Sequence, residues 1–163
     1  MKRKLGILCA ILVALMCACT ARPKEKEEYF LYFTRNSLAS YGSAVAPQEW
    51  KGGPDAAGMM AALLAGPTAE GLSTPFPKGL SVQSLETDSE AGMVRITLSD
   101  HYSGLTDISQ TLADACIVMT LCQLPGMEAV EISTDGFWAS RPASRILYPE
   151  QMELTSLLPE DFP

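Results

Sequence analysis

Three residue types that cooperate in hydrolases stand side by side in the sequence, as Ser99, Asp100 and His101. A catalytic triad needs these side chains to converge from separated positions, with the acid orienting the histidine. Adjacent residues at the end of a strand point to opposite faces instead. The sequence also contains no Gly-x-Ser-x-Gly turn, which would expose a nucleophilic serine. We therefore expect a solvated cluster here and no catalytic residues, so the chain is not expected to be an enzyme.

Cysteine chemistry is the next possibility, because Cys116 and Cys122 lie in one predicted helix. Their separation along the helix axis would be about 9 Å, whereas a disulfide needs Cα atoms within about 7 Å. We expect two buried thiols that pack as small hydrophobic groups. One histidine and two such cysteines do not supply the three or four ligands of a zinc site. No calcium loop or phosphate-binding glycine loop is present, so we expect no metal and no cofactor.

The charge balance bears on which partners the chain can bind. Its 163 residues include 19 acidic and 12 basic residues, for a formal net charge of −7. An acidic chain is a poor match for nucleic acid, whose phosphates favour clustered Lys and Arg. The acidic residues could form a glycosidase pair by accident, but no spacing singles one out. The length is that of one domain.

The N-terminus has the features of a secretory signal. A basic start, Lys2-Arg3-Lys4, precedes an apolar run from Leu5 to Met16 that is too short to span a bilayer comfortably. The end of this run, through Ala18-Cys19, resembles a bacterial lipobox, in which the cysteine is diacylated after cleavage just before it. The resemblance implies a signal peptide at 1–18, lipidation of Cys19, and a tether at 19–28. An ordinary signal peptide, cut nearby to release the domain, is the alternative.

Hydrophobic periodicity indicates the elements that would position any functional residue. Two helices are expected, the first starting at Pro54-Asp55 and ending before Gly66, the second at 107–124. The second helix should bury one stripe made of Ile108, Leu112, Ala115, Cys116, Met119 and Cys122. Strands are expected at 29–35, 43–49, 80–86, 93–99 and 128–134, and Pro47 would confine the second of these to a sheet edge. The order β(β)αββαβ predicts an α+β fold, with two helices on one face of a small, largely antiparallel sheet.

Three segments together resemble one known family. They are the helix end Ala61–Thr68, the loop and hairpin Pro75–Ser99, and the helix, Pro-Gly turn and strand from Ile117 to Gly136. In order and spacing they are similar to the GerMN domain of sporulation and spore germination proteins, over residues 29–137. The resemblance implies a fold akin to ring-building motifs and an extracytoplasmic, often lipid-anchored interaction module of Gram-positive bacteria. Residues 138–163 would form a Pro-containing C-terminal extension.

Two functions remain open from the sequence. The favoured one is a non-enzymatic module at the outer face of the cell membrane that docks to envelope proteins in sporulation or germination, through its sheet edge and acidic helix surface. The alternative is binding of cell-wall glycan, with Trp50 or Trp138 stacking on a sugar ring. Pro67, Pro77 and Lys78, in the loop at 66–79, are further candidates for contact with a partner. Peptidoglycan is thus a possible partner, and nucleic acid is not expected.

Overall fold

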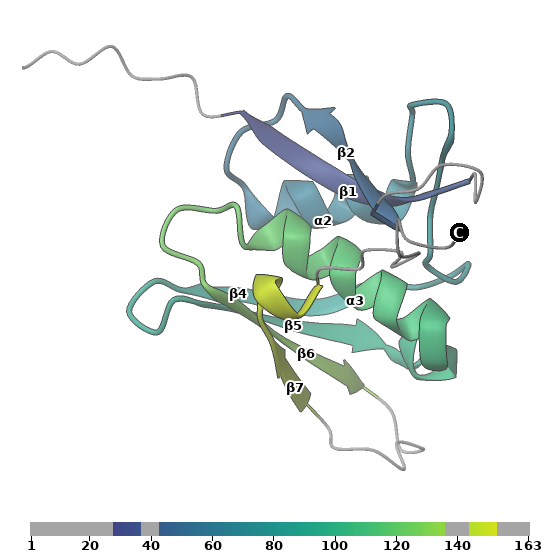
Figure 1. The fold of residues 1–163 in the computed structure, drawn as a ribbon. Coiled ribbons are helices and arrows are strands. Elements are labelled where there is room, and N and C mark those ends of the chain that lie inside the picture. Colours follow the sequence, from purple (N-terminus) through teal and green to yellow (C-terminus); the bar gives the residue numbers. More distant parts are fainter. Residues whose placement is uncertain (1–27, 37–42, 136–143, 153–163) are drawn as a thin grey trace, which may run out of the picture.

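The computed structural model of the chain describes residues 28–36, 43–135 and 144–152. Two helices, α2 (Ala56–Ala65) and α3 (Asp107–Leu121), lie between two β-sheets (Figure 1). The three-stranded sheet has the order β2-β1-β3 and the four-stranded sheet the order β4-β5-β6-β7. The strands are β1 (Tyr29–Arg35), β2 (Val45–Trp50), β3 (Leu72–Ser73), β4 (Val82–Asp88), β5 (Met93–Ser99), β6 (Ala129–Asp135) and β7 (Ser144–Leu147). Two short 3-10 helices, η1 (Asp100–Gly104) and η2 (Pro149–Met152), complete the described elements.

The expected α+β class with two helices is confirmed, but the strands form two sheets where a single sheet was expected. One pairing also differs from a largely antiparallel arrangement, because β5 and β6 run parallel, with Ile96 opposite Ile132. The connection from β5 to β6 passes through α3, which carries the chain back to the end from which β5 started. Helix positions were predicted from the sequence, but the side of a sheet that each helix covers depends on these crossovers.

The predicted helix α2 is confirmed in its ends and in its buried face. Asp55 is the N-cap, and its Oδ2 accepts a hydrogen bond from the Gly58 N–H at 2.9 Å. Gly66 ends the helix with a φ of 95°, a conformation that glycine adopts without strain. The core-facing side chains are those expected: Ala56, Met59, Met60 and Leu63 are buried, and Leu64 is partly buried.

The apolar stripe predicted for α3 is confirmed in part. Ala115 and Cys116 are buried, and Leu112, Met119 and Cys122 pack against the core. Ile108, placed on that stripe, is 76% exposed. Every residue from Ala113 to Val118 is buried, as are Thr120 and Leu121. The reason is the position of α3 between two sheets (Figure 1), since a helix covered on opposite sides is buried all round.

The strand predictions are close to the structure. Val94, Ile96 and Leu98 are buried on the inner face of β5, and Val130 and Ile132 on that of β6. Pro47 lies in β2, which is an edge strand of its sheet, as expected. The first strand of the hairpin begins at Val82, two residues later than predicted, and a bulge lies between Val82 and Ser84.

Residues beyond Asp135 also pack on the domain. The strand β7 pairs antiparallel with β6, and Met152 of η2 is buried in the core. Both lie in the predicted C-terminal extension at 138–163, so the described part of that extension is integrated into the fold. The predicted signal peptide, Cys19 and Trp138 lie outside the described residues.

Candidate functional site

The structure brings Ser99, Asp100 and His101 together at the end of β5, but without triad geometry. Asp100 Oδ1 lies 3.2 Å and Ser99 Oγ 3.5 Å from the same ring nitrogen, His101 Nδ1. In a triad, the acid and the serine lie at opposite ring nitrogens. The other nitrogen, Nε2, faces Gly79, where an added Cβ would lie 3.2 Å away. The cluster is exposed, which agrees with the expected solvated corner.

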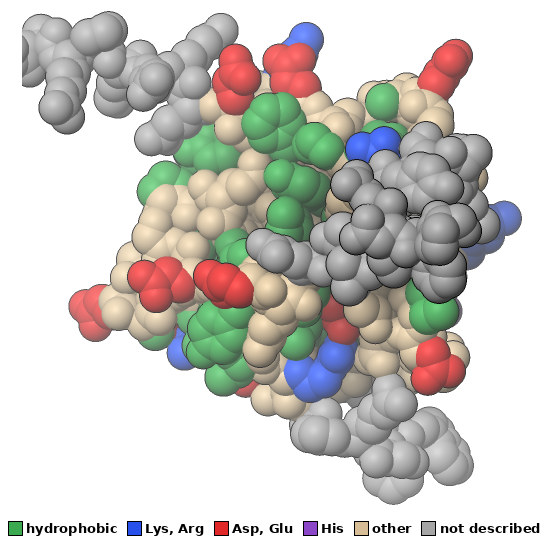
Figure 2. All heavy atoms as spheres, viewed as in Figure 1, with side chains coloured by type: hydrophobic (Ala, Val, Ile, Leu, Met, Phe, Trp, Pro, Cys, Tyr) green, Lys and Arg blue, Asp and Glu red, His purple; other side chains and the backbone are tan. Residues whose placement is uncertain are grey.

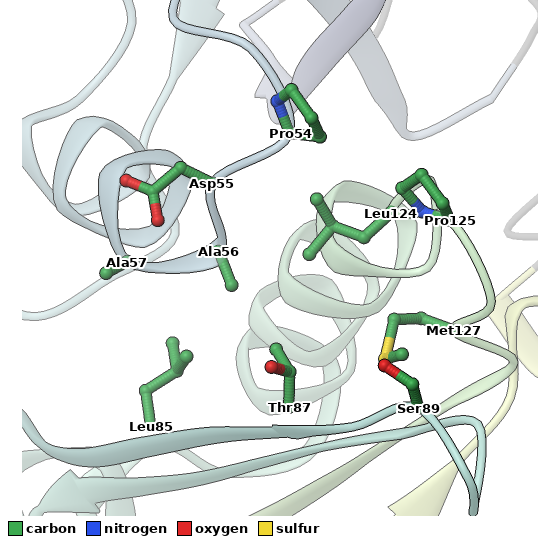
Figure 3. Close-up of a pocket in the computed structure, with 10 residues that line it drawn as sticks. All are labelled: Pro54, Asp55, Ala56, Ala57, Leu85, Thr87, Ser89, Leu124, Pro125 and Met127. Carbon is green, nitrogen blue, oxygen red and sulfur yellow. The ribbon is translucent and has the colours of Figure 1, made fainter.

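A cavity of about 290 Å³ lies between the start of α2 and the edge strand β4 (Figure 3). Leu85 and Thr87 of β4 point into it from below, and Ala56 points into it from α2. Leu124, Pro125 and Met127, from the turn after α3, close one end. We call this the α2–β4 groove. Most of the residues that line it are apolar, and Asp55, Thr87 and Ser89 add polar groups. Such a mixed surface suits the side chains and backbone of a protein partner.

Three carboxylates lie on the segments that border the α2–β4 groove. Glu86 lies on β4, Glu90 in the turn after it, and Glu128 next to Met127. All three are exposed, and none forms an ion pair with another described residue. The nearby Arg95 is already bound, with Nη1 2.9 Å from Asp88 Oδ2 and Nε 3.2 Å from Glu131 Oε2. Glu86 stands on the outer face of β4, and Glu90 and Glu128 lie next to groove residues in the chain; none of the three has an ion-pair partner among the described residues.

Arg95 and Asp88 also influence each other's protonation. The backbone N–H of Ala91 and the Arg95 guanidinium donate to Asp88 and hold the pKa of its carboxyl below the ordinary value. The hydrogen bond to Asp88 raises the pKa of Arg95 in turn. This pair stays charged at neutral pH, so Arg95 is held against the sheet.

The face drawn in Figure 2 shows no concentrated basic patch among its described residues. Acidic side chains are spread around the face seen in Figure 2, and its Lys and Arg side chains do not gather into one patch. Among residues 28–36, 43–135 and 144–152, no group of three His, Cys, Asp or Glu side chains could hold a metal ion. Nor does any helix in these ranges have the length and apolar character needed to cross a membrane.

Trp50, a predicted contact residue, is half-buried against the core. Its indole N–H donates to the Gly53 carbonyl at 2.8 Å. The ring covers Gly52, where an added Cβ would collide with it. The polar atom of the indole is thus used within the turn at 52–53, and stacking of Trp50 on a sugar stays a prediction.

The predicted loop residues lie at separate places. Pro67 is next to Thr68, whose N–H donates to Gln48 Oε1 of β2 at 2.8 Å. Lys78 is exposed next to Gly79, which faces His101 after β5. These two ends of the loop at 66–79 therefore lie against different sheets, and Pro77 is partly exposed beside Lys78. The structure does not gather the loop candidates into one site.

Sequence reasoning missed a buried polar cluster. Asp114 on α3 is 4% exposed and accepts from the Tyr102 hydroxyl at 2.6 Å. Arg145 of β7 donates to both oxygens of Asp114, at 2.7 and 2.8 Å. Burial and the neighbouring Asp114 raise the pKa of Tyr102 well above its ordinary value, so the hydroxyl remains a donor. The only signal was Asp114 itself, an acidic residue within the apolar stretch 112–119, and the cluster joins α3 to β7.

The two cysteines are free, as expected, and Cys116 is fully buried. Burial raises the pKa of Cys116 to about 12 and that of Cys122 to about 11. Thiols held in this form are poor nucleophiles and poor metal ligands. They contribute to packing and give no sign of chemistry.

Comparison with known proteins gives one family match. The family model Germane, described as sporulation and spore germination, matches residues 29–138. In a comparison with curated protein sequences, none matches the chain.

Solved structures with similar folds include tandem GerMN domains of the sporulation protein GerM from Bacillus subtilis, with a TM-score of 0.51 and 18% identity. That match covers 67% of this chain and 39% of the tandem structure, so this chain spans well under half of its length. The first GerMN domain of GerM alone gives a TM-score of 0.52 at 16% identity, over 67% of this chain and 83% of that one.

A third structure, named "Putative Lipoprotein from Clostridium perfringens", has a TM-score of 0.50 at 19% identity and covers 76% of this chain and 88% of its own. At these identities the likeness shows the fold alone. The match agrees with the α+β arrangement described above.

Proposed function

The chain belongs to the Germane family of sporulation and spore germination domains, and from that premise we propose that it is a lipid-anchored, extracytoplasmic module that docks to other envelope proteins. The observation that carries this proposal is the open edge strand β4 beside the α2–β4 groove. Unpaired strand edges and apolar grooves are surfaces that proteins use to bind other proteins. Docking in sporulation or germination is the role that fits both the family and this surface.

The anchor is the lipid on Cys19. The folded domain starts at Tyr29, ten residues after Cys19, and the segment between them is polar and charged. A tether of this composition lets the domain stand away from the membrane. The acidic net charge would disfavour flat contact with anionic lipid headgroups. The structural neighbour named as a lipoprotein supports the same arrangement.

The test is a crosslinking pull-down of tagged protein from intact cells, both growing and entering sporulation. We expect envelope or sporulation proteins to be enriched over an unrelated lipoprotein. The matched control is Cys19→Ala, which removes the lipid and leaves the domain unchanged. Recovery of wall glycan with no enriched protein would contradict docking and favour the glycan-binding alternative, for which the internal hydrogen bond of Trp50 gives no support.

A further inference from the structure

We propose that β4 and the α2–β4 groove bind an extended, basic segment of a partner protein, which pairs with β4 as an added strand. This inference rests on the proposed docking function and names the surface and the chemistry of the partner. Three independent features support it: the character of the β4 edge, the groove beside it, and the acidic side chains on and next to β4.

The β4 edge is the least protected of the four sheet edges in the described part of the chain. Proteins commonly block exposed edges with proline, lysine, bulges or very short strands. The other edges follow this rule: β2 carries Pro47, β3 has two residues and β7 has four. β4 has seven residues and no Pro or Lys, and its bulge affects only the Val82 end. Ser84 to Asp88 therefore present a regular row of backbone groups to an incoming strand.

The groove would select among partner segments by the side chains that enter it. Side chains alternate across a strand, so every second residue of the added segment would face the α2–β4 groove. Leu85 and Thr87 line its floor, and Ala56 and Met127 form opposite walls (Figure 3). Side chains of the partner would contact Leu85 and Met127 there and could donate to the Thr87 hydroxyl, while the intervening residues would face the outer surface of the sheet.

The acidic residues on and next to β4 favour basic side chains in the partner segment. Glu86 stands on the outer face of β4, opposite Arg95, and Arg95 is already held by Asp88 and Glu131. Glu86 and Glu90 have no ion-pair partner among the described residues. Opposite charges on neighbouring strands stabilise a sheet, and like charges destabilise it. A segment with Lys or Arg at alternate positions is therefore favoured over an acidic or neutral one.

The same charges disfavour a second copy of this chain as the occupant. Pairing two β4 edges would bring Glu86 and Glu90 of one copy against those of the other, with no basic residue on either strand. Self-association through this edge is thus expected to be weaker than binding of a basic segment.

The experiment places a photocrosslinking residue, benzoylphenylalanine, at three positions of the full-length chain in cells that make it. Position 87 lies in the α2–β4 groove, position 146 on β7 at the opposite edge, and position 70 on a loop outside the four-stranded sheet. The crosslinked segment is identified by mass spectrometry. We expect adducts at position 87 from a partner segment with several Lys or Arg residues and no net negative charge.

The outcomes separate this inference from the docking function. Adducts at position 146 or 70 without any at 87 would overturn the inference and leave docking intact. An acidic segment, or this chain itself, captured at 87 would also overturn it. No protein adduct at any of the three positions would remove the docking function together with the inference.

A binding measurement with the captured segment completes the test. The synthetic segment should bind the purified chain about tenfold more weakly when Glu86 and Glu90 are both changed to Lys. Thr87→Trp, which fills the groove, should weaken binding similarly. Glu70→Lys is the matched control for charge and should leave the affinity unchanged. Thermal unfolding checks that each variant is folded, and equal affinity of folded E86K/E90K and wild type would overturn the proposal.

Discussion

The side-chain amide of Gln123 pairs with the backbone of Phe30 as a neighbouring strand would. Gln123 Oε1 accepts from the Phe30 N–H at 3.0 Å, and Gln123 Nε2 donates to the Phe30 carbonyl at 2.8 Å. Nearby, Thr120 Oγ1 accepts from the Tyr32 N–H at 3.0 Å. Because β3 pairs with β1 only at Thr34 and Arg35, the end of α3 and the turn after it supply partners for three further backbone groups of β1. One edge of this fold is thus closed by a helix, whereas the β4 edge is left open.

Replacing Gln123 should therefore destabilise the fold. Gln123→Ala leaves part-buried backbone groups of Phe30 without partners, which costs about 1–3 kcal/mol. Gln123→Glu keeps the shape but places a carboxylate against the carbonyls of Phe30, Met119 and Thr120. Urea unfolding at pH 7 should show both losses.

The glutamate variant adds a pH dependence with a defined sign. Carbonyl neighbours disfavour its charged form, so the folded state binds a proton more readily than the unfolded state does. The stability of Gln123→Glu should therefore rise as the pH falls toward the range in which glutamate is protonated. Gln83→Glu, at an exposed position on β4, is the control. Equal effects of the two glutamate variants would contradict the role of Gln123.

Arg145→Met should cost about 3–5 kcal/mol, because it leaves the buried Asp114 carboxylate without its cation. The loss is measured by urea unfolding, with Arg35→Met as an exposed control. The triple variant Tyr102→Phe, Asp114→Leu and Arg145→Met removes the whole polar cluster. It should recover most of the lost stability, since apolar replacement of a buried ion pair is often close to neutral. A triple variant as unstable as Arg145→Met alone would show that packing, and not the orphaned charge, decides.

The sequence was most informative where one side of an element faces the core. The hairpin β4–β5 and the helix α2 were predicted because their apolar residues repeat with a strand or helix period. The buried face of α2 and the glycine end at Gly66 were read correctly for the same reason. Local turn chemistry and periodicity suffice for such elements.

The sequence was least informative where the environment comes from distant segments. The predicted stripe on α3 was too narrow because sheets cover the helix on two sides, and Ile108 is exposed despite its apolar side chain. The α2–β4 groove joins Ala56 to Leu85 and Met127, which are far apart in the chain. No local sequence pattern predicts that these distant residues come together in space. The roles of Asp114 and Gln123 also depend on long-range partners, so neither was predicted.

Cys116 and Cys122 should react slowly with a thiol reagent at pH 8 in the folded protein, and rapidly in urea. Burial raises the pKa of Cys116 to about 12 and that of Cys122 to about 11, so little thiolate is present. The measurement uses a variant with Cys9, Cys17 and Cys19 changed to Ser, so that only these two thiols report. Cys122 is only partly buried and should react before Cys116, and fast labelling of Cys116 in the folded protein would contradict its burial.

The same thiols should make the protein less stable at alkaline pH. The folded pKa of Cys116 is raised, so its stabilising effect is complete below the ordinary value near 9 and is lost as pH rises toward 12. The loss is up to about 1.4 kcal/mol per pH unit for one group. Cys116→Ala should flatten the fall in urea midpoint between pH 9 and 11, and an unchanged slope would contradict the assignment.

Gly52→Ala should displace the Trp50 ring, because the added Cβ would collide with it. Overpacking of this kind costs about 1–3 kcal/mol, and loss of the indole hydrogen bond to Gly53 adds to it. Tryptophan fluorescence, in a Trp138→Phe background, should shift toward longer wavelength as the ring becomes exposed. Gly104→Ala is the matched control, since nothing lies near its added Cβ. An unchanged spectrum for Gly52→Ala would mean that Trp50 does not depend on this turn.

Cys19→Ala should move the protein from the membrane fraction to the soluble fraction of lysed cells. The reason is that lipid on Cys19 is the proposed anchor. Cys17→Ala is the matched control. Cys17 lies two residues before Cys19, the first residue after the proposed cleavage, and would be removed with the signal peptide. Loss of membrane association in Cys17→Ala but not in Cys19→Ala would move the lipid to the earlier cysteine. Membrane retention of both variants would contradict lipidation at either position and leave attachment through a bound partner.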